Sequence, residues 1–274
     1  MGVKKNSSSI YGIEVLADNI VWVWAEGDKA VVIDPSISEP ISHWLTLNRL
    51  TLIAILQTHH HEDHIGGTKG LLRQWPNASV IASKSDLRRI PMQTISVADG
   101  DTFRLMGSKV KVLGVQGHTN EHIAFYIEIQ NDEKNSNILF CGDTLFGAGC
   151  GRIFEGTFED MYRSLQIINS LPEETEIFCA HEYTVQNLEW ALSLKTNDPL
   201  IVRRFKREKE KRGKGLLTIP STPRPRSPIL NLLWFSVVFV PWPTKPRPRT
   251  AGNTRRPRSR PESRGLTRPL GHRS

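Results

Sequence analysis

The sequence predicts a mixed α/β (α+β) fold in which two sheets are each covered by helices, with a further helical segment on the C-terminal side. Short β-branched and aromatic runs, separated by turn residues, dominate the first 145 residues. Longer stretches with helical spacing dominate the residues that follow. Polar residues with reactive side chains come directly after several of the apolar runs, which places a candidate site at one edge of the sheets.

The predicted strands are short apolar runs rich in Val, Ile, Phe and Trp. They span residues 10–16, 20–25, 30–34, 52–56, 79–82, 94–97, 109–115, 123–129 and 138–141. The dipeptides Asp18-Asn19 and Gly27-Asp28 separate the first three runs, and Asp99-Gly100-Asp101 forms a later turn. The N-terminal runs therefore read as a meander of neighbouring strands.

The predicted helices show apolar residues at helical spacing. They span residues 38–48, 68–74, 158–169, 184–194 and 198–212, and the last of these is strongly charged. Gly66-Gly67 opens the second helix. The chain shows no internal repeat.

The net charge of +8 comes from the C-terminal tail. Residues 223–274 hold twelve Lys and Arg against one acid, a contribution of +11, so residues 1–222 carry −3. Ten of the seventeen prolines also lie in this tail, which predicts a disordered segment outside the folded domain. The apolar run 229–240 within it is shorter than the roughly 20 residues that cross a bilayer. A nucleic-acid-binding role for the basic tail stays open. We expect the folded part to bind neither nucleic acid nor a membrane.

Three cysteines without a Cys-x-x-Cys spacing, Cys141, Cys150 and Cys179, favour a reducing compartment. The polar N-terminus has no apolar stretch of the kind a secretory signal needs. We therefore expect a cytoplasmic protein.

Four of the nine histidines lie within seven residues, directly after the apolar run 52–56. His59 and His61 are two apart, so their side chains project from one face of an extended segment. Asp63 and His64 are adjacent to each other and face a different direction, so they could serve a second ion. Imidazoles and carboxylates are the groups that zinc, iron or manganese take from proteins, and the cluster therefore predicts metal binding.

Three further candidate ligands follow the ends of other predicted strands. His118 comes after the run 109–115, Asp143 after 138–141, and His181 after the apolar residues 176–180. Their shared position at strand ends, together with the histidine cluster, predicts that all three join the same site.

Seven candidate ligands are enough for two ions. Three histidines could hold one ion, and an aspartate with two histidines the other, which leaves Asp143 to bridge them. Two such ions lower the pKa of a water molecule to about 7 and polarise a carbonyl oxygen, which is the chemistry of acyl-bond hydrolysis. A thiolate leaving group, with a thiol pKa of about 8.5, would need no strong general acid.

These residues resemble the metallo-β-lactamase superfamily, whose signature is Thr-His-x-His-x-Asp-His, here residues 58–64. Within it, residues 10–222 are similar to the glyoxalase II (hydroxyacylglutathione hydrolase) family. The closer match lies in four segments: Cys-Gly-Asp-Thr-Leu-Phe at 141–146 with Gly-Cys-Gly-Arg at 149–152, Glu-Gly-Thr at 155–157, His-Glu-Tyr-Thr at 181–184, and Thr-Ile-Pro-Ser-Thr at 218–222.

The resemblance implies an αββα sandwich over residues 1–170, a helical substrate-binding segment over 171–222, and an atypical tail over 223–274. It assigns His59, His61 and His118 to the first ion, Asp63, His64 and His181 to the second, and Asp143 to both. Asp63 and Asp143 are the expected catalytic carboxylates. The implied reaction converts S-D-lactoylglutathione and water into glutathione and D-lactate, in a monomer that uses two divalent ions, usually zinc, with iron or manganese as alternatives.

The resemblance also implies three substrate-binding residues, Arg152, Phe154 and Tyr183. The family often has a tyrosine where this chain has Phe154, and Phe154 cannot donate a hydrogen bond. After Thr222 the family continues with an Asn-Pro-Phe motif and basic residues that bind the glutathione carboxylates. This chain lacks that motif, so we expect metal binding to be retained and glutathione affinity to be the property at risk.

Three other enzyme classes are alternatives to the thioesterase. A persulfide dioxygenase with one iron ion uses a similar ligand set on the same fold, although the long helical segment through residue 212 favours the thioesterase. A β-lactamase is disfavoured because zinc β-lactamases often carry a cysteine where Asp143 stands. A nuclease of this superfamily is disfavoured because residues 1–222 show no RNA-binding arm.

Overall fold

The computed structural model describes residues 8–129, 136–194 and 198–221. All of these residues belong to one compact unit. The predicted tail, including the apolar run 229–240, lies outside the described residues. Among the described residues, no helix combines the length and apolar character needed to span a membrane.

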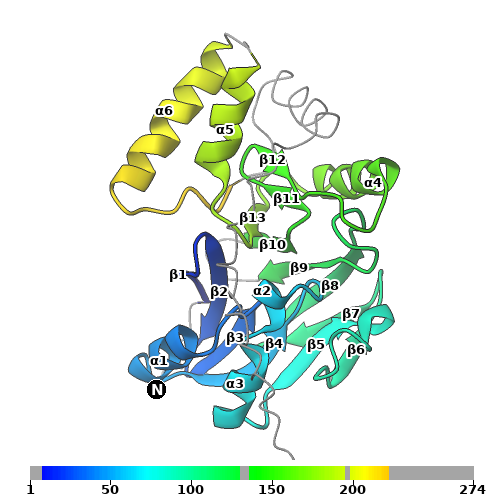
Figure 1. The fold of residues 1–274 in the computed structure, drawn as a ribbon. Helices are drawn as coiled ribbons and strands as arrows, with labels where there is room; N and C mark the ends of the chain where they lie inside the picture. Colours follow the sequence, from blue (N-terminus) through cyan, green and yellow to red (C-terminus); the bar gives the residue numbers. More distant parts are fainter. Residues whose placement is uncertain (1–7, 130–135, 195–197, 222–274) are drawn as a thin grey trace, which may run out of the picture. The chain divides into compact units, whose positions relative to one another are not determined.

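The first sheet is built from the N-terminal strands, which follow one another in sequence order across it (Figure 1). They are β1 (Ser9–Val15), β2 (Asn19–Glu26), β3 (Lys29–Ile33), β4 (Thr51–Leu56), β5 (Ser79–Ser83) and β6 (Ile95–Val97). The meander β1 to β3 is antiparallel as predicted, and the strands from β3 to β6 are parallel. The parallel connections carry α1 (Glu39–Leu47), α2 (Glu62–Ile65) and α3 (Thr68–Gln74).

The second sheet has the order β13-β10-β9-β8-β7. Its strands are β7 (Thr102–Leu105), β8 (Ser108–Gly114), β9 (Ile123–Ile129), β10 (Ser136–Gly142) and β13 (Glu176–Cys179). A small hairpin of β11 (Leu145–Phe146) and β12 (Gly149–Cys150) follows β10. The remaining helices are α4 (Phe158–Asn169), α5 (Thr184–Ser193) and α6 (Pro199–Gly213).

Alternating side chains of β2 show how the layers pack. Trp22 and Trp24 lie in the core between the two sheets, whereas Val21 and Val23 belong to a separate cluster with Leu45 of α1. A strand with both faces buried has a continuous apolar sequence rather than an alternating one. Composition, and not alternation, therefore predicts the strand at residues 20–25.

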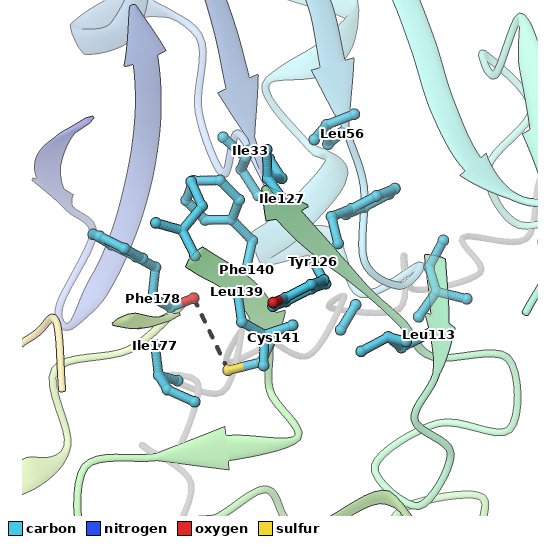
Figure 2. Close-up of a cluster of buried hydrophobic side chains, with 14 of the residues drawn as sticks. Ile33, Leu56, Leu113, Tyr126, Ile127, Leu139, Phe140, Cys141, Ile177 and Phe178 are labelled. Atoms are coloured by element: carbon cyan, nitrogen blue, oxygen red, sulfur yellow. Dashed lines mark hydrogen bonds between the residues drawn. The ribbon is translucent and has the colours of Figure 1, made fainter. Parts of the chain in front are cut away.

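The core between the sheets continues into the second sheet (Figure 2). Ile33 and Leu56 of the first sheet share this cluster with Ile127 of the second, and the Cys141 thiol lies 3.9 Å from the Phe178 carbonyl that it faces. Three apolar side chains of α4 join the same cluster: Met161, Leu165 and Ile168. With helices packed on both sheets, the architecture is the predicted αββα sandwich.

The elements missed from the sequence are short. α2 was read as a loop because its four residues carry no apolar period, and β7, β11 and β12 have four residues or fewer. The predicted C-terminal helices are present as α5 and α6, and Leu188, Ala191 and Ile201 form their shared apolar contact. The division at residue 170 stays a prediction, although β13, which lies beyond it, pairs with β10 of the second sheet.

Candidate metal centre

The candidate ligands lie at the carboxyl ends of strands because of how the strands run. β8 and β10 are both antiparallel to β9, and β13 is parallel to β10, so the ends of β8, β10 and β13 lie at one edge. His118, Asp143 and His181 follow those three strands. His59 follows β4 in the first sheet, which shares a buried core with the second. The structure therefore gathers residues up to 122 positions apart in sequence.

The first group consists of His59, His61 and His118. The Nδ1 atom of His61 lies 3.0 Å from His59 Nε2 and 3.0 Å from His118 Nε2. Nitrogens bound about 2.0–2.1 Å from one tetrahedral zinc ion lie about 3.3 Å apart. The three imidazoles are therefore spaced as ligands of a single cation would be.

The second group consists of Asp63, His64 and His181. Asp63 Oδ2 lies 3.5 Å from His181 Nε2 and 3.7 Å from His64 Nε2. No helix was expected at Asp63 and His64, and the structure places both residues on the single turn of α2. This turn directs the two side chains toward His181 rather than toward His61.

Asp143 faces both groups. Its Oδ2 lies 3.4 Å from His118 Nε2, while its Oδ1 lies 3.4 Å from His181 Nε2 and 3.5 Å from His64 Nε2. Asp143 Oδ1 and His64 Nε2 are buried, yet neither has a hydrogen-bond partner among the described residues. Buried polar atoms are normally satisfied, so a donor set with these two atoms turned inward fits a pair of cations.

Burial and charge divide the ligands into two electrostatic classes. Burial lowers the pKa of His59 well below its usual value, and burial with the neighbouring His118 lowers the pKa of His61 to about 4. Despite burial, Asp143 raises the pKa of His64, and Asp143 with Asp18 raises the pKa of His181 to about 9. The first group thus presents neutral imidazoles, whereas a cation in the second group would displace protons.

Polar contacts outside the two groups orient the ligands, and these partners were not identified from the sequence. Asp18 Oδ1 lies 2.9 Å from His181 Nδ1, the Arg152 carbonyl 2.6 Å from His118 Nδ1, and Asp34 Oδ2 3.2 Å from His64 Nδ1. Such contacts fix which nitrogen of a metal-binding histidine carries the proton. The only sequence signal was position, since Asp34 directly follows β3 as Asp143 follows β10.

His122 is a buried histidine that belongs to neither group. Its ring stacks on His59 with centroids 4.6 Å apart, and its Nε2 accepts the Asp143 amide hydrogen at 3.2 Å. Since Nε2 accepts, Nδ1 carries the proton and faces the Thr144 hydroxyl at 3.4 Å. His122 therefore supports Asp143 through its backbone rather than contributing a ligand atom.

The three residues expected to bind substrate lie around the two groups. The exposed ring of Phe154 contacts His61 and His118 edge-on, with centroids 5.5 and 5.2 Å away. The Arg152 guanidinium lies 5.0 Å from the Phe154 ring centre. Tyr183 stacks on His181 with centroids 4.8 Å apart, and burial raises the pKa of its hydroxyl.

Known proteins are similar to this chain in sequence and in fold. The Metallo-beta-lactamase superfamily matches residues 13–181. A hydroxyacylglutathione hydrolase of Prochlorococcus marinus (strain NATL2A) is 56% identical over 80% of this chain and 86% of that protein. One from strain MIT 9303 is 53% identical over 80% of this chain and 84% of that protein.

A solved structure gives an independent comparison of the fold. The crystal structure of ETHE1 from Myxococcus xanthus superposes with a TM-score of 0.54 at 27% identity, covering 64% of this chain and 76% of that one. Together with the two groups of candidate ligands, these similarities place the chain in the hydroxyacylglutathione hydrolase family of the metallo-beta-lactamase superfamily.

Proposed function

We propose that this chain is a thioester hydrolase that converts S-D-lactoylglutathione and water into glutathione and D-lactate, the second step of methylglyoxal detoxification. The relatives named hydroxyacylglutathione hydrolase match about 80% of this chain at 53% and 56% identity. The observation that carries the proposal is the position of Asp143, which directs one carboxylate oxygen toward each group of candidate ligands. A carboxylate placed in this way could bind both ions of a pair.

Two divalent zinc ions are the proposed cofactors, with iron or manganese as alternatives. His59, His61 and His118 would hold one ion, Asp63, His64 and His181 the other, and Asp143 both. When bound, the pair would supply a water of lowered pKa and an electrophilic contact for the acyl oxygen.

The chain's own residues would position the reactants. Asp63 is held by Asn19, which donates to its Oδ2 at 3.1 Å, and its side chain is 41% exposed. It is therefore the candidate to take up a proton and pass it to solvent. Arg152, Phe154 and Tyr183 surround the ligand groups, where they would contact the glutathione thioester. A thiolate product leaves without a strong general acid.

The remaining proposals concern the state of the protein. Its three cysteines are free, in keeping with the reducing cytoplasm that we expect. We propose a monomer whose partner is a small molecule, and no nucleic-acid role for residues 1–222.

The test is hydrolysis of S-D-lactoylglutathione by the full chain, with metal content measured on the same sample. We expect thioester cleavage with two metal ions per chain, and Asp143→Ala should abolish it. A folded protein that holds two ions and does not cleave this thioester would refute the proposal.

The rival function is a persulfide dioxygenase with one iron ion. Oxygen consumption on glutathione persulfide, with one iron per chain and no thioesterase activity, would decide for it. Asp143 also forms a third candidate group with His59 and His64, so a single ion could use it too, and the ion count together with the two activities decides between these functions.

A further inference from the structure

A second cluster of charged side chains lies beside the candidate metal centre without belonging to it. It consists of His60, Asp86, Arg89 and Glu155. His60 stands between two candidate ligands in sequence, yet its ring nitrogens face Asp86 and Glu155 instead of the ligand groups. The four residues come from three segments. His60 lies between β4 and α2, Asp86 and Arg89 follow β5, and Glu155 lies in the loop after β12.

Arg89 connects the members of this cluster. Its Nε donates to Asp86, and its Nη1 donates to Glu155 Oε1 at 2.5 Å. His60 Nδ1 lies 3.3 Å from Asp86 Oδ2, and His60 Nε2 lies 3.5 Å from Glu155 Oε1. The Asp86 side chain is fully buried, and a buried carboxylate needs a paired charge. Arg89 is therefore anchored on the buried side and reaches outward to Glu155.

Glu155 joins this cluster to the loop that carries the proposed substrate contacts. Its Oε2 accepts the Asn120 amide hydrogen at 2.9 Å. In the same loop, the Phe154 amide donates to the His118 carbonyl at 3.2 Å and the Gly156 amide to the Gly117 carbonyl at 3.3 Å. The backbone of residues 152–156 is thus hydrogen-bonded to Gly117 and His118, and the Glu155 carboxylate binds Arg89 and the Asn120 amide.

We propose that the Arg89–Glu155 pair, supported by Asp86 and His60, holds the loop 152–156 in the conformation that presents Arg152 and Phe154 to the glutathione thioester. These are positioning residues, and the inference rests on the proposed function for the identity of that substrate. Arg89 and Glu155 have side chains 37% and 26% exposed, and a pair so close to solvent contributes little to overall stability. Loss of the pair in Glu155→Gln, which leaves Arg89 on Asp86, should therefore appear in substrate binding rather than in the melting temperature.

The kinetic test uses Glu155→Gln, Arg89→Gln and the double variant, each loaded with metal. We expect the KM for S-D-lactoylglutathione to rise about 3- to 10-fold, because the unheld loop must be ordered on binding, with kcat and metal content unchanged. The double variant should bind substrate no worse than Arg89→Gln, since that change alone already breaks the pair with Glu155 as well as the contact with Asp86. Glu128→Gln is the matched control, because Glu128 forms an exposed pair with Lys109 on the sheet. An unchanged KM, or a kcat that falls together with metal content, would overturn the inference.

A second measurement does not depend on activity. Trypsin cuts after Arg152, which is exposed in this loop, and mass spectrometry can follow cleavage of that one bond. We expect faster cleavage in Glu155→Gln than in wild type or Glu128→Gln. Equal rates in all three proteins would overturn the positioning role. If wild-type protein with two ions does not cleave the thioester, the proposed function fails, while the trypsin result still decides whether Glu155 holds the loop.

Discussion

Asp34 lies beneath the second group of candidate ligands and controls which nitrogen of His64 faces the cations. Its Oδ1 accepts the Thr58 amide hydrogen at 2.8 Å, and its Oδ2 accepts the Thr58 hydroxyl hydrogen at 2.7 Å and lies 3.2 Å from His64 Nδ1. All three residues are buried. With a carboxylate at this position, a metal-bound His64 would keep its proton on Nδ1 and offer Nε2 to the cation.

Asp34→Asn should reverse this arrangement. The asparagine must place its oxygen toward the Thr58 amide, because that N–H cannot turn away. Its NH₂ group then takes the place of Oδ2 and donates to His64 Nδ1. The proton of a neutral His64 moves to Nε2, the atom 3.5 Å from Asp143 Oδ1, and a protonated nitrogen cannot bind a cation.

Changes of this kind next to a metal-binding histidine typically cost about 10- to 100-fold in metal affinity, or about 1.4 to 2.8 kcal/mol. The assay is dialysis against graded chelator followed by metal analysis. Wild type should keep both ions at chelator concentrations that strip one ion from Asp34→Asn. Asp101→Asn is the control, because Asp101 is an exposed turn residue whose carboxylate accepts the Ala98 amide hydrogen at 2.8 Å. Folded Asp34→Asn protein with wild-type affinity for both ions would refute the reasoning.

Three further predictions concern other parts of the molecule. Thr218→Val removes a hydroxyl that donates to buried Glu182 at 2.5 Å. Because a hydrogen bond to a charged group contributes about 1.5 to 3 kcal/mol, the melting temperature should fall by about 3 to 12 °C, and an unchanged melting temperature would contradict this. Metal binding at pH 7.5 should release protons, because His181 has a pKa of about 9 in the metal-free protein, and metal affinity should therefore rise with pH until about pH 9. Calorimetry in buffers of different ionisation enthalpy measures this release, and a result of no released protons would contradict the prediction. Phe154→Tyr adds a hydroxyl to an exposed ring beside the ligands; a hydrogen bond to substrate worth about 1 kcal/mol would lower KM about fivefold, whereas an equal or higher KM would show that this ring edge does not face the substrate.

Much of the fold could be predicted because burial leaves a periodic or composition signal in long elements. The bounds predicted for α3, α4 and β9 agree with the structure, and each of these elements buries an apolar face. α2 gave no such signal, because it is a single turn determined by the geometry around Asp63 and His64 rather than by its own propensity. The seven candidate ligands could be named because histidine is uncommon and because each ligand follows a strand or belongs to the histidine cluster.

The partners of those ligands could not be predicted for a different reason. Asp18 contacts His181 across 163 positions of sequence, and Asp34 contacts His64 across 30. A single aspartate after a turn or a strand is common in any sequence, so neither residue was distinguishable until the fold placed it beside a histidine. The Arg89–Glu155 pair was hidden in the same way, since no local pattern connects the turn after β5 with the loop after β12.

The central claim is that seven side chains at the ends of strands hold two cations. Anomalous diffraction from crystals of the metal-loaded full chain tests this directly. We expect two peaks about 3.5–4 Å apart, one among His59, His61 and His118, the other among Asp63, His64 and His181, with Asp143 contacting both. A single peak, or none at these side chains in a folded and metal-saturated protein, would contradict it.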